Sequence, residues 1–342
     1  MNKMNSDNLK TKTEGLKRPY HHGKNRFRNL PNSDIKKPRK RSYLSFVLRM
    51  MRYGKEQIAI PKDHVIPQKE AATILHQHLE AQTDSLTWLG QACFLIKIQG
   101  KTILTDPYLS SHASPSRLAG PKRIVEPGIH LNDLPVIDYL VLSHNHYDHL
   151  DARTISQLRG KKDMTVIVPL KLGHYFKKRG FSNVIEMDWW DSFDANGLTI
   201  RALPSQHWSK RTPFDRNKSL WASYSFESPQ NKVYFTGDTG YAPLFKDIGA
   251  AFGPFDYTLV GIGAYEPQEI MKAHHTTPEE AVMIAKDVKS TALVAMHWGT
   301  VRLTDEPMFE PPGRFLQAAG DAGYDADKIW VMSIGESRAL TK

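Results

Sequence analysis

The chain has 342 residues, of which 40% are hydrophobic, enough to bury a sizeable core in one large or two ordinary domains. Its formal net charge of +10 is unevenly distributed, because residues 1–50 contain 14 Lys and Arg but only Asp7, Glu14 and Asp34 as acidic residues. The rest of the chain has 32 basic and 33 acidic side chains, and this near-neutral balance argues against a body that binds nucleic acid.

Cysteine content and hydropathy exclude further structural features. The single cysteine, Cys93, rules out an internal disulfide and a cysteine-based zinc cage, and we expect it to be a small core residue. No apolar run reaches the roughly 18–20 residues that cross a membrane, and residues 1–40 lack the apolar stretch of a signal peptide. We therefore expect a cytoplasmic protein, either free or peripherally attached to a membrane.

The N-terminal arm, residues 1–50, is predicted to be disordered or to lie against a membrane, and residues 51–342 are predicted to form a single domain. Residues 1–40 are rich in Lys, Arg and Asn and lack apolar periodicity, which favours disorder. Residues 43–53 are apolar with two arginines, so they form either an amphipathic helix at a membrane surface or a segment packed on the domain. A polybasic tail suits anionic lipid, so residues 1–60 are expected to contact an anionic membrane.

Strands and helices alternate along the body of the chain. A helix is expected at residues 70–81, followed by strands at 86–98 and 102–105 that are joined by a turn at Gln99 and Gly100. The next strand, 137–143, ends at a histidine cluster. Later strands are expected at 164–169, 198–203, 220–226, 232–236, 257–262, 292–296 and 329–333, and helices at 152–158, 172–178, 278–289 and 313–322.

The order of these elements indicates the fold class. Thr277, Pro278 and Glu280 form a strong helix start, with an N-cap, a proline at the first position and an acid at the third. No repeat of fixed period is evident. Strands outnumber helices and occur in hairpins and strand–helix pairs, which favours a layered α/β sandwich over a doubly wound parallel sheet.

Four of the predicted strands end at residues that can bind a metal ion. His144, His146, Asp148 and His149 follow the strand at 137–143, His207 follows 198–203, Asp238 follows 232–236 and His297 follows 292–296. Loops at strand ends are where a rigid scaffold presents catalytic groups. A polar loop with satisfied histidines is the alternative for the first cluster, but so dense a cluster after an apolar strand favours metal binding.

Imidazole and carboxylate ligands suit a hydrolytic metal site. Zinc accepts both ligand types, and without thiolates it stays Lewis acidic. The set is too large for one tetrahedral ion and fits two, which would share Asp238. Two metal ions about 3.5–4 Å apart can activate a water and brace the attacking and leaving oxygens.

Longer tracts resemble a known family. His144-Asn-His-Tyr-Asp-His149 matches the His-x-His-x-Asp-His signature of the metallo-β-lactamase superfamily. The resemblance is closer to one branch, the N-acylphosphatidylethanolamine-hydrolysing phospholipase D family, and it spans about residues 86–340. Matching tracts include Thr87-Trp-Leu-Gly90, Leu104-Thr-Asp-Pro107, Pro204-Ser-Gln-His-Trp208, Gly237-Asp-Thr-Gly-Tyr241, His297-Trp-Gly-Thr300 and Gly335-Glu-Ser-Arg338.

The resemblance implies an αββα four-layer sandwich that holds two zinc ions. It places His144, His146 and His207 on one zinc ion, Asp148, His149 and His297 on the other, and Asp238 between them. It further implies cleavage of N-acylphosphatidylethanolamine to phosphatidic acid and an N-acylethanolamine, by a homodimer at a membrane surface.

Several residues are candidates for contact with the substrate. The resemblance places Tyr147 and His275 near the substrate phosphate, and Asp148 is the ligand best placed to orient the nucleophile. Trp208 and Trp298 suit an acyl-chain pocket or a membrane interface, with core packing as the alternative. Arg211 is a candidate contact for a lipid phosphate, and a solvated loop arginine is the other interpretation.

One departure from the branch and several alternatives remain open. The branch commonly has Leu-Gly-His-Ala where this chain has Leu89-Gly-Gln-Ala92, and Gln91 cannot titrate near neutral pH as histidine can. Iron or manganese could replace zinc on the same ligands. The alternative functions are a related hydrolase of another phosphodiester or a lactone, and a non-catalytic binding protein.

Overall fold

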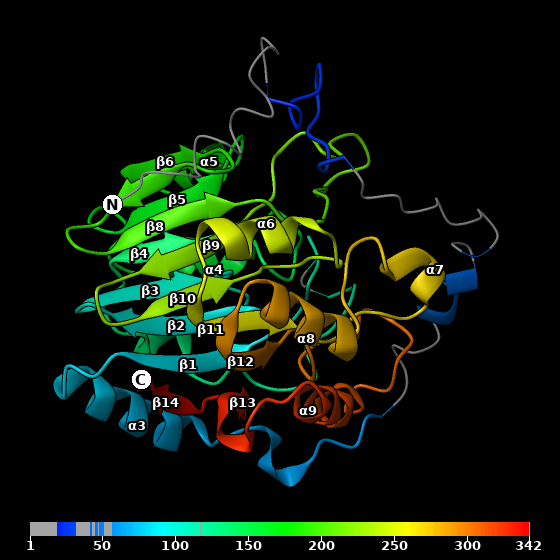
Figure 1. The fold of residues 1–342 in the computed structure, drawn as a ribbon. Helices are drawn as coiled ribbons and strands as arrows, with labels where there is room; N and C mark the ends of the chain where they lie inside the picture. Colours follow the sequence, from blue (N-terminus) through cyan, green and yellow to red (C-terminus); the bar gives the residue numbers. More distant parts are fainter. Residues whose placement is uncertain are drawn as a thin grey trace.

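A computed structural model describes residues 19–31, 42, 45–46, 48–50, 57–116 and 118–341. Two seven-stranded sheets of mixed direction pack face to face, and helices cover their outer faces (Figure 1). This arrangement is the predicted αββα sandwich. Among the described residues, no helix is both long and apolar enough to span a bilayer.

The first sheet has the order β14-β1-β2-β3-β4-β5-β6. Its pairs are antiparallel from β14 to β3 and parallel from β3 to β6. The strands are β1 (Ser85–Gly90), β2 (Cys93–Ile98), β3 (Lys101–Thr105), β4 (Tyr139–Val141), β5 (Thr165–Pro169), β6 (Asn183–Met187) and β14 (Ser337–Ala339). Buried side chains of α3 (Gln68–Glu80), α4 (Ala152–Gln157) and α5 (Gly173–Lys177) share one apolar cluster with its outer face.

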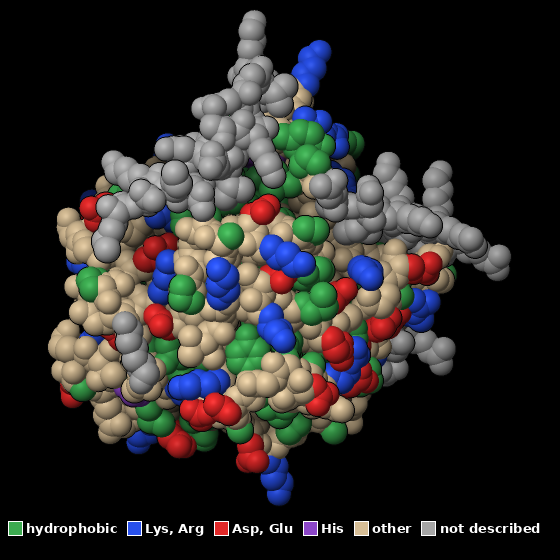
Figure 2. All heavy atoms as spheres, viewed as in Figure 1, with side chains coloured by type: hydrophobic (Ala, Val, Ile, Leu, Met, Phe, Trp, Pro, Cys, Tyr) green, Lys and Arg blue, Asp and Glu red, His purple; other side chains and the backbone are tan. Residues whose placement is uncertain are grey.

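The second sheet has the order β13-β12-β11-β10-β9-β8-β7. The strands are β7 (Ser192–Asp194), β8 (Thr199–Leu203), β9 (Ser223–Glu227), β10 (Lys232–Phe235), β11 (Phe255–Gly261), β12 (Ser290–Met296) and β13 (Ile329–Trp330). In Figure 1, α6 (Leu244–Ala251), α8 (Pro278–Asp287) and α9 (Pro311–Asp321) lie over this sheet. Figure 2 shows basic and acidic side chains interspersed on this face, in keeping with the near-neutral charge of the body.

The two sheets repeat one pairing pattern. From β1 to β6 the successive pairs are antiparallel, antiparallel, parallel, parallel and parallel, and the pairs from β8 to β13 follow the same series. The duplication is one of topology, since the sequence has no evident repeat. Asp106 after β3 and Asp238 after β10 therefore follow equivalent strands, and both reach the same end of the sandwich.

Large aromatic side chains fill the space between the sheets. Trp88, Phe94, Tyr224, Phe226 and Phe235 are fully buried in one continuous cluster. Each such side chain contributes about 1.5–3 kcal/mol when removed from water, so the strands form a rigid support for the loops at their ends. Cys93 is buried as well, which confirms that it is a core residue, and Trp221 is also buried.

The structure differs from the expected elements at a few places. The strand expected at 86–98 is divided in two, because Gln91 adopts a positive φ of 56° between β1 and β2. Edge strands β6 and β7 were not expected, because their residues are mostly polar or partly exposed and give no apolar run. Helices α6 and α7 (Gln268–Met271) and the C-terminal strand β14 were also not expected.

Part of the N-terminal arm is ordered, so the prediction of disorder for residues 1–40 is wrong for residues 19–31. Phe27 is buried there, and its backbone N–H donates to the carbonyl of Asn217 (2.7 Å). His21 is also buried, so local burial of two aromatic rings outweighs the polar composition. Residues 1–18 and 32–40 lie outside the described residues.

The described part of the segment at 43–53 packs on the domain. Phe46 is buried, and Arg49 forms an ion pair with Asp305 (2.6 Å). Of the two alternatives for this segment, these contacts favour packing on the body. Residues 43, 44, 47 and 51–53 lie outside the described part.

Candidate metal centre

The loop that follows β4 presents the first candidate ligands. Because β4 lies between β3 and β5 in parallel, its C-terminal end opens at the same edge as theirs. Arg211 supports the loop, since its Nη1 donates to the carbonyls of Asn145 (2.8 Å) and Leu150 (2.7 Å). Asp151, which follows Leu150, is the N-cap of α4 and so fixes the C-terminal end of the ligand loop.

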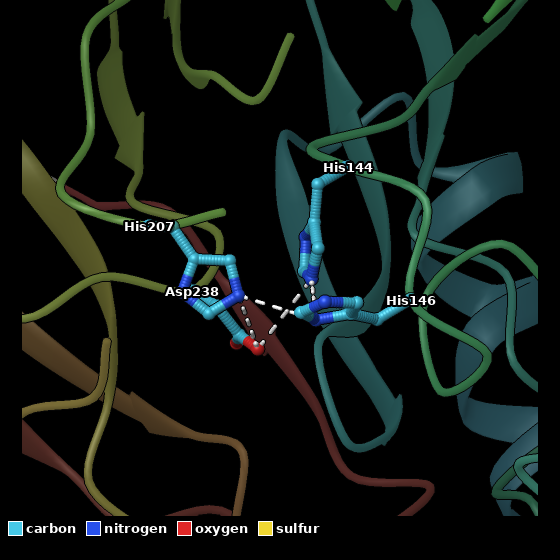
Figure 3. A group of neighbouring side chains, drawn as sticks. All are labelled: His144, His146, His207 and Asp238. Carbon is cyan, nitrogen blue, oxygen red and sulfur yellow. Dashed lines mark hydrogen bonds and ion pairs between the residues drawn. The ribbon is translucent and has the colours of Figure 1, made fainter. Parts of the chain in front are cut away.

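Three imidazoles and one carboxylate form the first ligand group (Figure 3). Nδ1 of His146 lies 2.8 Å from Nε2 of His144 and 3.2 Å from Nε2 of His207. Oδ2 of Asp238 lies 3.8 Å from the Nε2 atoms of His144 and His207. Three segments that are distant in sequence thus direct four ligand atoms to a common point.

The second ligand group comprises Asp148, His149, His297 and the same Asp238. Nε2 of His149 lies 3.0 Å from Oδ2 of Asp238 and 3.4 Å from Oδ2 of Asp148. Nε2 of His297 lies 3.2 Å from Oδ1 of Asp238 and 3.3 Å from Oδ2 of Asp148. The structure therefore brings together every residue predicted as a metal ligand, and Asp238 belongs to both groups.

Hydrogen bonds on the outer side of each ring define the ligand atoms. Ser143 Oγ donates to Asp106 and therefore accepts from Nδ1 of His144, while Nδ1 of His207 donates to the carbonyl of His274 (2.8 Å). Nδ1 of His149 donates to Asp106 Oδ2 (2.6 Å). The inner Nε2 atoms of these three rings carry lone pairs, which is the arrangement that fixes histidine as a metal ligand.

A cation fits both groups better than hydrogen bonds do. In the first group, the lone pairs of His144 and His207 both face Nδ1 of His146, and one proton cannot satisfy them all. In the second group, the lone pair of His149 faces two buried carboxylates. Among the described residues, no donor meets hydrogen-bond geometry at the buried Oδ1 of Asp238. Converging lone pairs and carboxylates of this kind match the donor set of two divalent ions.

Charge differs between the two groups. Burial lowers the pKa of all three imidazoles of the first group, to about 3 for His146. Burial also lowers the pKa of His297, but Asp238 and Asp148 outweigh it and raise that pKa to about 9. Burial raises the pKa of both carboxylates, yet His149 and His297 hold it well below the usual value. The first group therefore has the neutral imidazoles that bind metal, whereas a metal ion at the second group would have to displace the protons that the carboxylates favour on His149 and His297.

Asp106 was not recognised as a site residue from the sequence. Its carboxylate is fully buried and accepts hydrogen bonds from His149 Nδ1 and from the backbone and hydroxyl of Ser143. The tract Leu104-Thr-Asp-Pro107 was part of the family resemblance, and its position after an apolar strand was a usable signal. The parallel pairing of β3 with β4 is what sets Asp106 beside the ligand loop.

Gln91 lies inside the second group. Its Nε2 donates to Asp148 Oδ2 (2.9 Å) and lies 2.8 Å from Nε2 of His297. Its backbone carbonyl accepts from the N–H of His297 (3.0 Å). The residue that departs from the family pattern therefore contacts two candidate ligands directly.

The residues predicted to act in catalysis or to contact the substrate lie at different distances from the ligand groups. His275 lies at the centre, with Nδ1 3.9 Å from Asp238 Oδ2, and burial lowers its pKa to about 4. Tyr147 lies further out, and its hydroxyl donates to the carbonyl of Arg211 (2.9 Å). The Arg211 guanidinium stacks on the Tyr147 ring at 4.0 Å in addition to holding the ligand loop.

The two candidate tryptophans flank opposite ligand groups. Trp208 is half-buried, and its ring lies 4.5 Å from that of His146. Trp298 is buried and stacks on Trp88 at 5.4 Å, and its indole N–H has no hydrogen-bond partner among the residues that the structure describes. A narrow cavity with room for about one water molecule lies beside the second group and is lined by Gln91, Ala264, His297, Trp298, Leu303 and Met308, among others.

Comparison with known proteins identifies relatives of this chain. The family described as "Beta-lactamase superfamily domain" matches residues 101–298. An uncharacterised protein of Mycobacterium tuberculosis is 41% identical over 245 residues, which are 70% of this chain and 65% of that protein. The chain thus spans about two thirds of the length of its mycobacterial relatives.

A nematode relative and a solved structure extend the comparison. The N-acyl-phosphatidylethanolamine-hydrolyzing phospholipase D 1 of Caenorhabditis elegans is 40% identical over 250 residues, 70% of each chain. Igni18, a metallo hydrolase of Ignicoccus hospitalis, has a TM-score of 0.58 and 24% identity, with 76% of this chain and 99% of that chain covered. The chain therefore belongs to the metallo-β-lactamase superfamily and, within it, to the family of N-acylphosphatidylethanolamine-hydrolysing phospholipases D.

Proposed function

We propose that the protein is a metal-dependent hydrolase of phosphodiesters, and that its substrate is N-acylphosphatidylethanolamine, which it converts to N-acylethanolamine and phosphatidic acid. The observation that carries the proposal is the carboxylate of Asp238, which approaches imidazoles of both ligand groups at 3.0–3.8 Å. A shared carboxylate between two His-rich groups suits paired-metal hydrolysis. The lipid is the substrate that the name of the nematode relative states.

The metal ions are proposed to be zinc. We assign one ion to His144, His146 and His207, the other to Asp148, His149 and His297, and both to Asp238. Iron and manganese accept the same donors, so elemental analysis of protein purified without added metal is the test of zinc. When bound, two divalent ions would supply Lewis acidity and lower the pKa of water at the site.

Residues of the chain itself prepare the site for this reaction. Asp106 holds His149 in the tautomer whose lone pair faces the ligand group, and Asp148 is proposed to orient the attacking water. His275 lies within reach of the shared carboxylate, and its lowered pKa keeps it neutral at neutral pH. We assign it an N–H that donates to a phosphate oxygen as negative charge develops there.

Apolar surface near the ligand groups supports a lipid substrate. Trp298, Leu303 and Met308 contribute apolar lining to the narrow cavity beside His297, and we propose that this cavity opens to receive the hydrocarbon part of a substrate. Trp208 is proposed to contact the substrate at the other ligand group. Tyr147 and Arg211 stay candidates for contact with the substrate, although both side chains already support the ligand loop.

A substrate panel tests the proposal. Wild-type protein is incubated with N-acylphosphatidylethanolamine in mixed micelles, with bis-p-nitrophenyl phosphate and with an acyl-homoserine lactone, and products are followed by mass spectrometry. We expect phosphatidic acid and N-acylethanolamine from the lipid. Turnover of the lactone alone would replace this assignment, and turnover of only the small diester would retain the reaction but not the substrate.

Two associations are also proposed, a homodimer and contact of residues 1–60 with an anionic membrane. Sedimentation velocity tests the dimer. Because residues 19–31 are folded against the body, deletion of residues 1–60 would disturb the fold as well as any membrane contact. Vesicle flotation is better done with neutral substitutions at Lys36, Lys37, Arg39 and Lys40, and binding that these substitutions leave unchanged would count against the membrane contact.

A further inference from the structure

The ordered part of the N-terminal arm contacts the first ligand group. The side chain of Asn29 brackets the backbone of His207: its Nδ2 donates to the His207 carbonyl (3.0 Å), and its Oδ1 accepts from the His207 N–H (3.2 Å). The same Oδ1 accepts from the indole N–H of Trp221 (3.0 Å). One side chain therefore fixes both backbone polar groups of a candidate ligand that is 178 residues away.

Residues 19–31 form what we call the strap. It makes a tight turn in which His22 pairs with Phe27, and Phe27 is buried. The N–H of Phe27 donates to the carbonyl of Asn217, whose own N–H donates to the carbonyl of Ser209, two residues after His207. The strap thus contacts the loop of His207 at two points, through Asn29 and through Phe27.

A second fastening lies at the other end of the strap. Nε2 of His21 lies 2.6 Å from Oδ1 of Asp188, and Nε2 of His22 lies 2.7 Å from Oδ2 of the same carboxylate. The His21 ring stacks on Trp189 at 4.3 Å, and the indole of Trp189 donates to the carbonyl of Trp221 (2.6 Å). This fastening therefore connects through Trp221 to the amide of Asn29.

The three residues of this fastening also have the composition of a metal site. Their nitrogen–oxygen distances of 2.6 and 2.7 Å are those of direct hydrogen bonds. At the second ligand group, the corresponding contacts of His149 and His297 with carboxylates are 3.0–3.4 Å. The difference assigns hydrogen bonding, and not a third metal ion, to His21, His22 and Asp188.

We propose that Asn29 is a positioning residue for His207, and that the strap is thereby a working part of the first metal site. His207 has no side-chain carboxylate behind it, because its Nδ1 donates to a backbone carbonyl, that of His274. Its orientation therefore depends on where the backbone lies, and the strap fixes that backbone. This inference rests on the proposed metal centre but not on the identity of the substrate.

The test compares Asn29→Ala with Asn25→Ala, a matched control at the exposed tip of the same turn. Full-length proteins are loaded with zinc or cobalt, titrated with a chelator, and analysed for metal content and for the cobalt absorption spectrum. We expect Asn29→Ala to weaken one of the two ions by about 10–100-fold, the usual effect of a lost supporting contact, and to change the cobalt spectrum. Asn25→Ala should match the wild type.

Further variants keep the result interpretable. Asn29→Asp retains the acceptor for His207 N–H and for Trp221 but loses the donor, so it should weaken the ion less than Asn29→Ala does. Circular dichroism of the metal-free proteins shows whether each variant folds. If Asn29→Ala folds and keeps both ions with wild-type affinity and spectrum, the positioning role is overturned. A third ion lost on Asp188→Ala would overturn the hydrogen-bonded fastening.

The outcome also separates this inference from the proposed function. If the wild type binds two ions but hydrolyses no phosphodiester, the proposed function fails, while the effect of Asn29→Ala on metal affinity can still be measured. If the wild type binds no metal ion after supplementation, the metal centre itself fails and the inference with it. Loss of one ion in Asn29→Ala with both ions retained in Asn25→Ala supports the strap whether or not the wild type hydrolyses a phosphodiester.

Discussion

The two ligand groups share Asp238 but are supported in different ways. In the first group, the outer contacts are neutral: a serine hydroxyl behind His144, a carbonyl behind His207, and the amide of Asn29. In the second group, the buried carboxylate of Asp106 stands behind His149, and Gln91 contacts Asp148 and His297. The second group also has an additional carboxylate of its own, Asp148.

This difference predicts unequal affinity. A divalent ion in the second group faces more negative charge within a buried site, where Coulomb interactions are weakly screened. Its imidazole at His149 is further polarised by Asp106, which raises ligand basicity. The first group is held mainly by the fold around it. We therefore expect the two sites to respond differently to substitution, and the predictions below begin with the ligand that both sites share.

Substitution of the shared ligand should have the largest effect, because it acts on both groups. Asp238→Asn removes the charge that faces imidazoles of each group, so we expect less than one metal ion per chain and a loss of hydrolysis greater than about 100-fold, beyond the range of a supporting residue. Elemental analysis and initial rates measure both. Asp247→Asn, at an exposed position of α6, is the matched control. Full metal content and rate in Asp238→Asn would refute the two-metal scheme.

Asp106→Asn should affect one group more than the other. The amide still accepts from His149 but carries no charge, so we expect the second ion to weaken by about 10–100-fold while the first changes less. A chelator titration followed by elemental analysis resolves the two ions. Asp138→Asn serves as the control, because Asp138 also accepts a backbone hydrogen bond but is not among the candidate ligands or their outer contacts. Equal weakening of both ions would show that the supporting contacts are not separable.

The sequence predicted the metal ligands because they follow apolar runs that were recognisable as strands, and the end of each run showed where its strand ends. It predicted the start of α8 equally well, since the capping box of Thr277 and Glu280 is a local pattern. The supports were not predictable in this way. Asp106 reaches His149 through strand pairing, and Asn29 reaches His207 across 178 residues, so neither contact leaves a local signature.

The N-terminal arm shows the same limit of sequence-based prediction, because here the sequence indicated less structure than is present. Composition indicated disorder for residues 1–40, but two buried aromatic rings and one amide fix residues 19–31 on loops that are distant in sequence. The repeated pairing pattern of the two sheets was also hidden, because topology can repeat without a repeated sequence. Local patterns therefore identified the chemistry, while the long-range contacts that orient it required the structure.

His275 should influence catalysis more than metal binding. His275→Ala removes a proposed donor to the substrate phosphate, so we expect kcat to fall by about 100-fold while both ions are retained. Steady-state kinetics and metal analysis on the same preparations separate the two effects. His76→Ala, at an exposed position of α3, is the control. Loss of a metal ion in His275→Ala would instead make this residue part of a ligand group.

Substitution of Gln91 should have the smallest effect, because it removes contacts with Asp148 and His297 but no ligand. Gln91→Asn is the informative change, since asparagine tolerates the positive φ of 56° but is too short to reach Asp148 as glutamine does. A lost hydrogen bond to a charged group is worth about 1.5–3 kcal/mol at most, and the retained contacts of Asp148 with two imidazoles should limit the weakening of the second ion to about tenfold. Gln82→Asn has the same substitution at a similar φ of 53° on the surface and should leave both ions unchanged.

The reverse experiment introduces the residue that is common in the family. Gln91→His adds a group that titrates between about pH 5 and 8, next to Asp148 and His297, so the rate should acquire an additional pH dependence in that range. Rates measured from pH 5 to 9 with saturating metal reveal it. An unchanged pH profile with both ions bound would mean that this position supports the second group by shape and hydrogen bonding alone. Gln91 would then be equivalent to histidine in function, and the departure from the family pattern would have no chemical consequence.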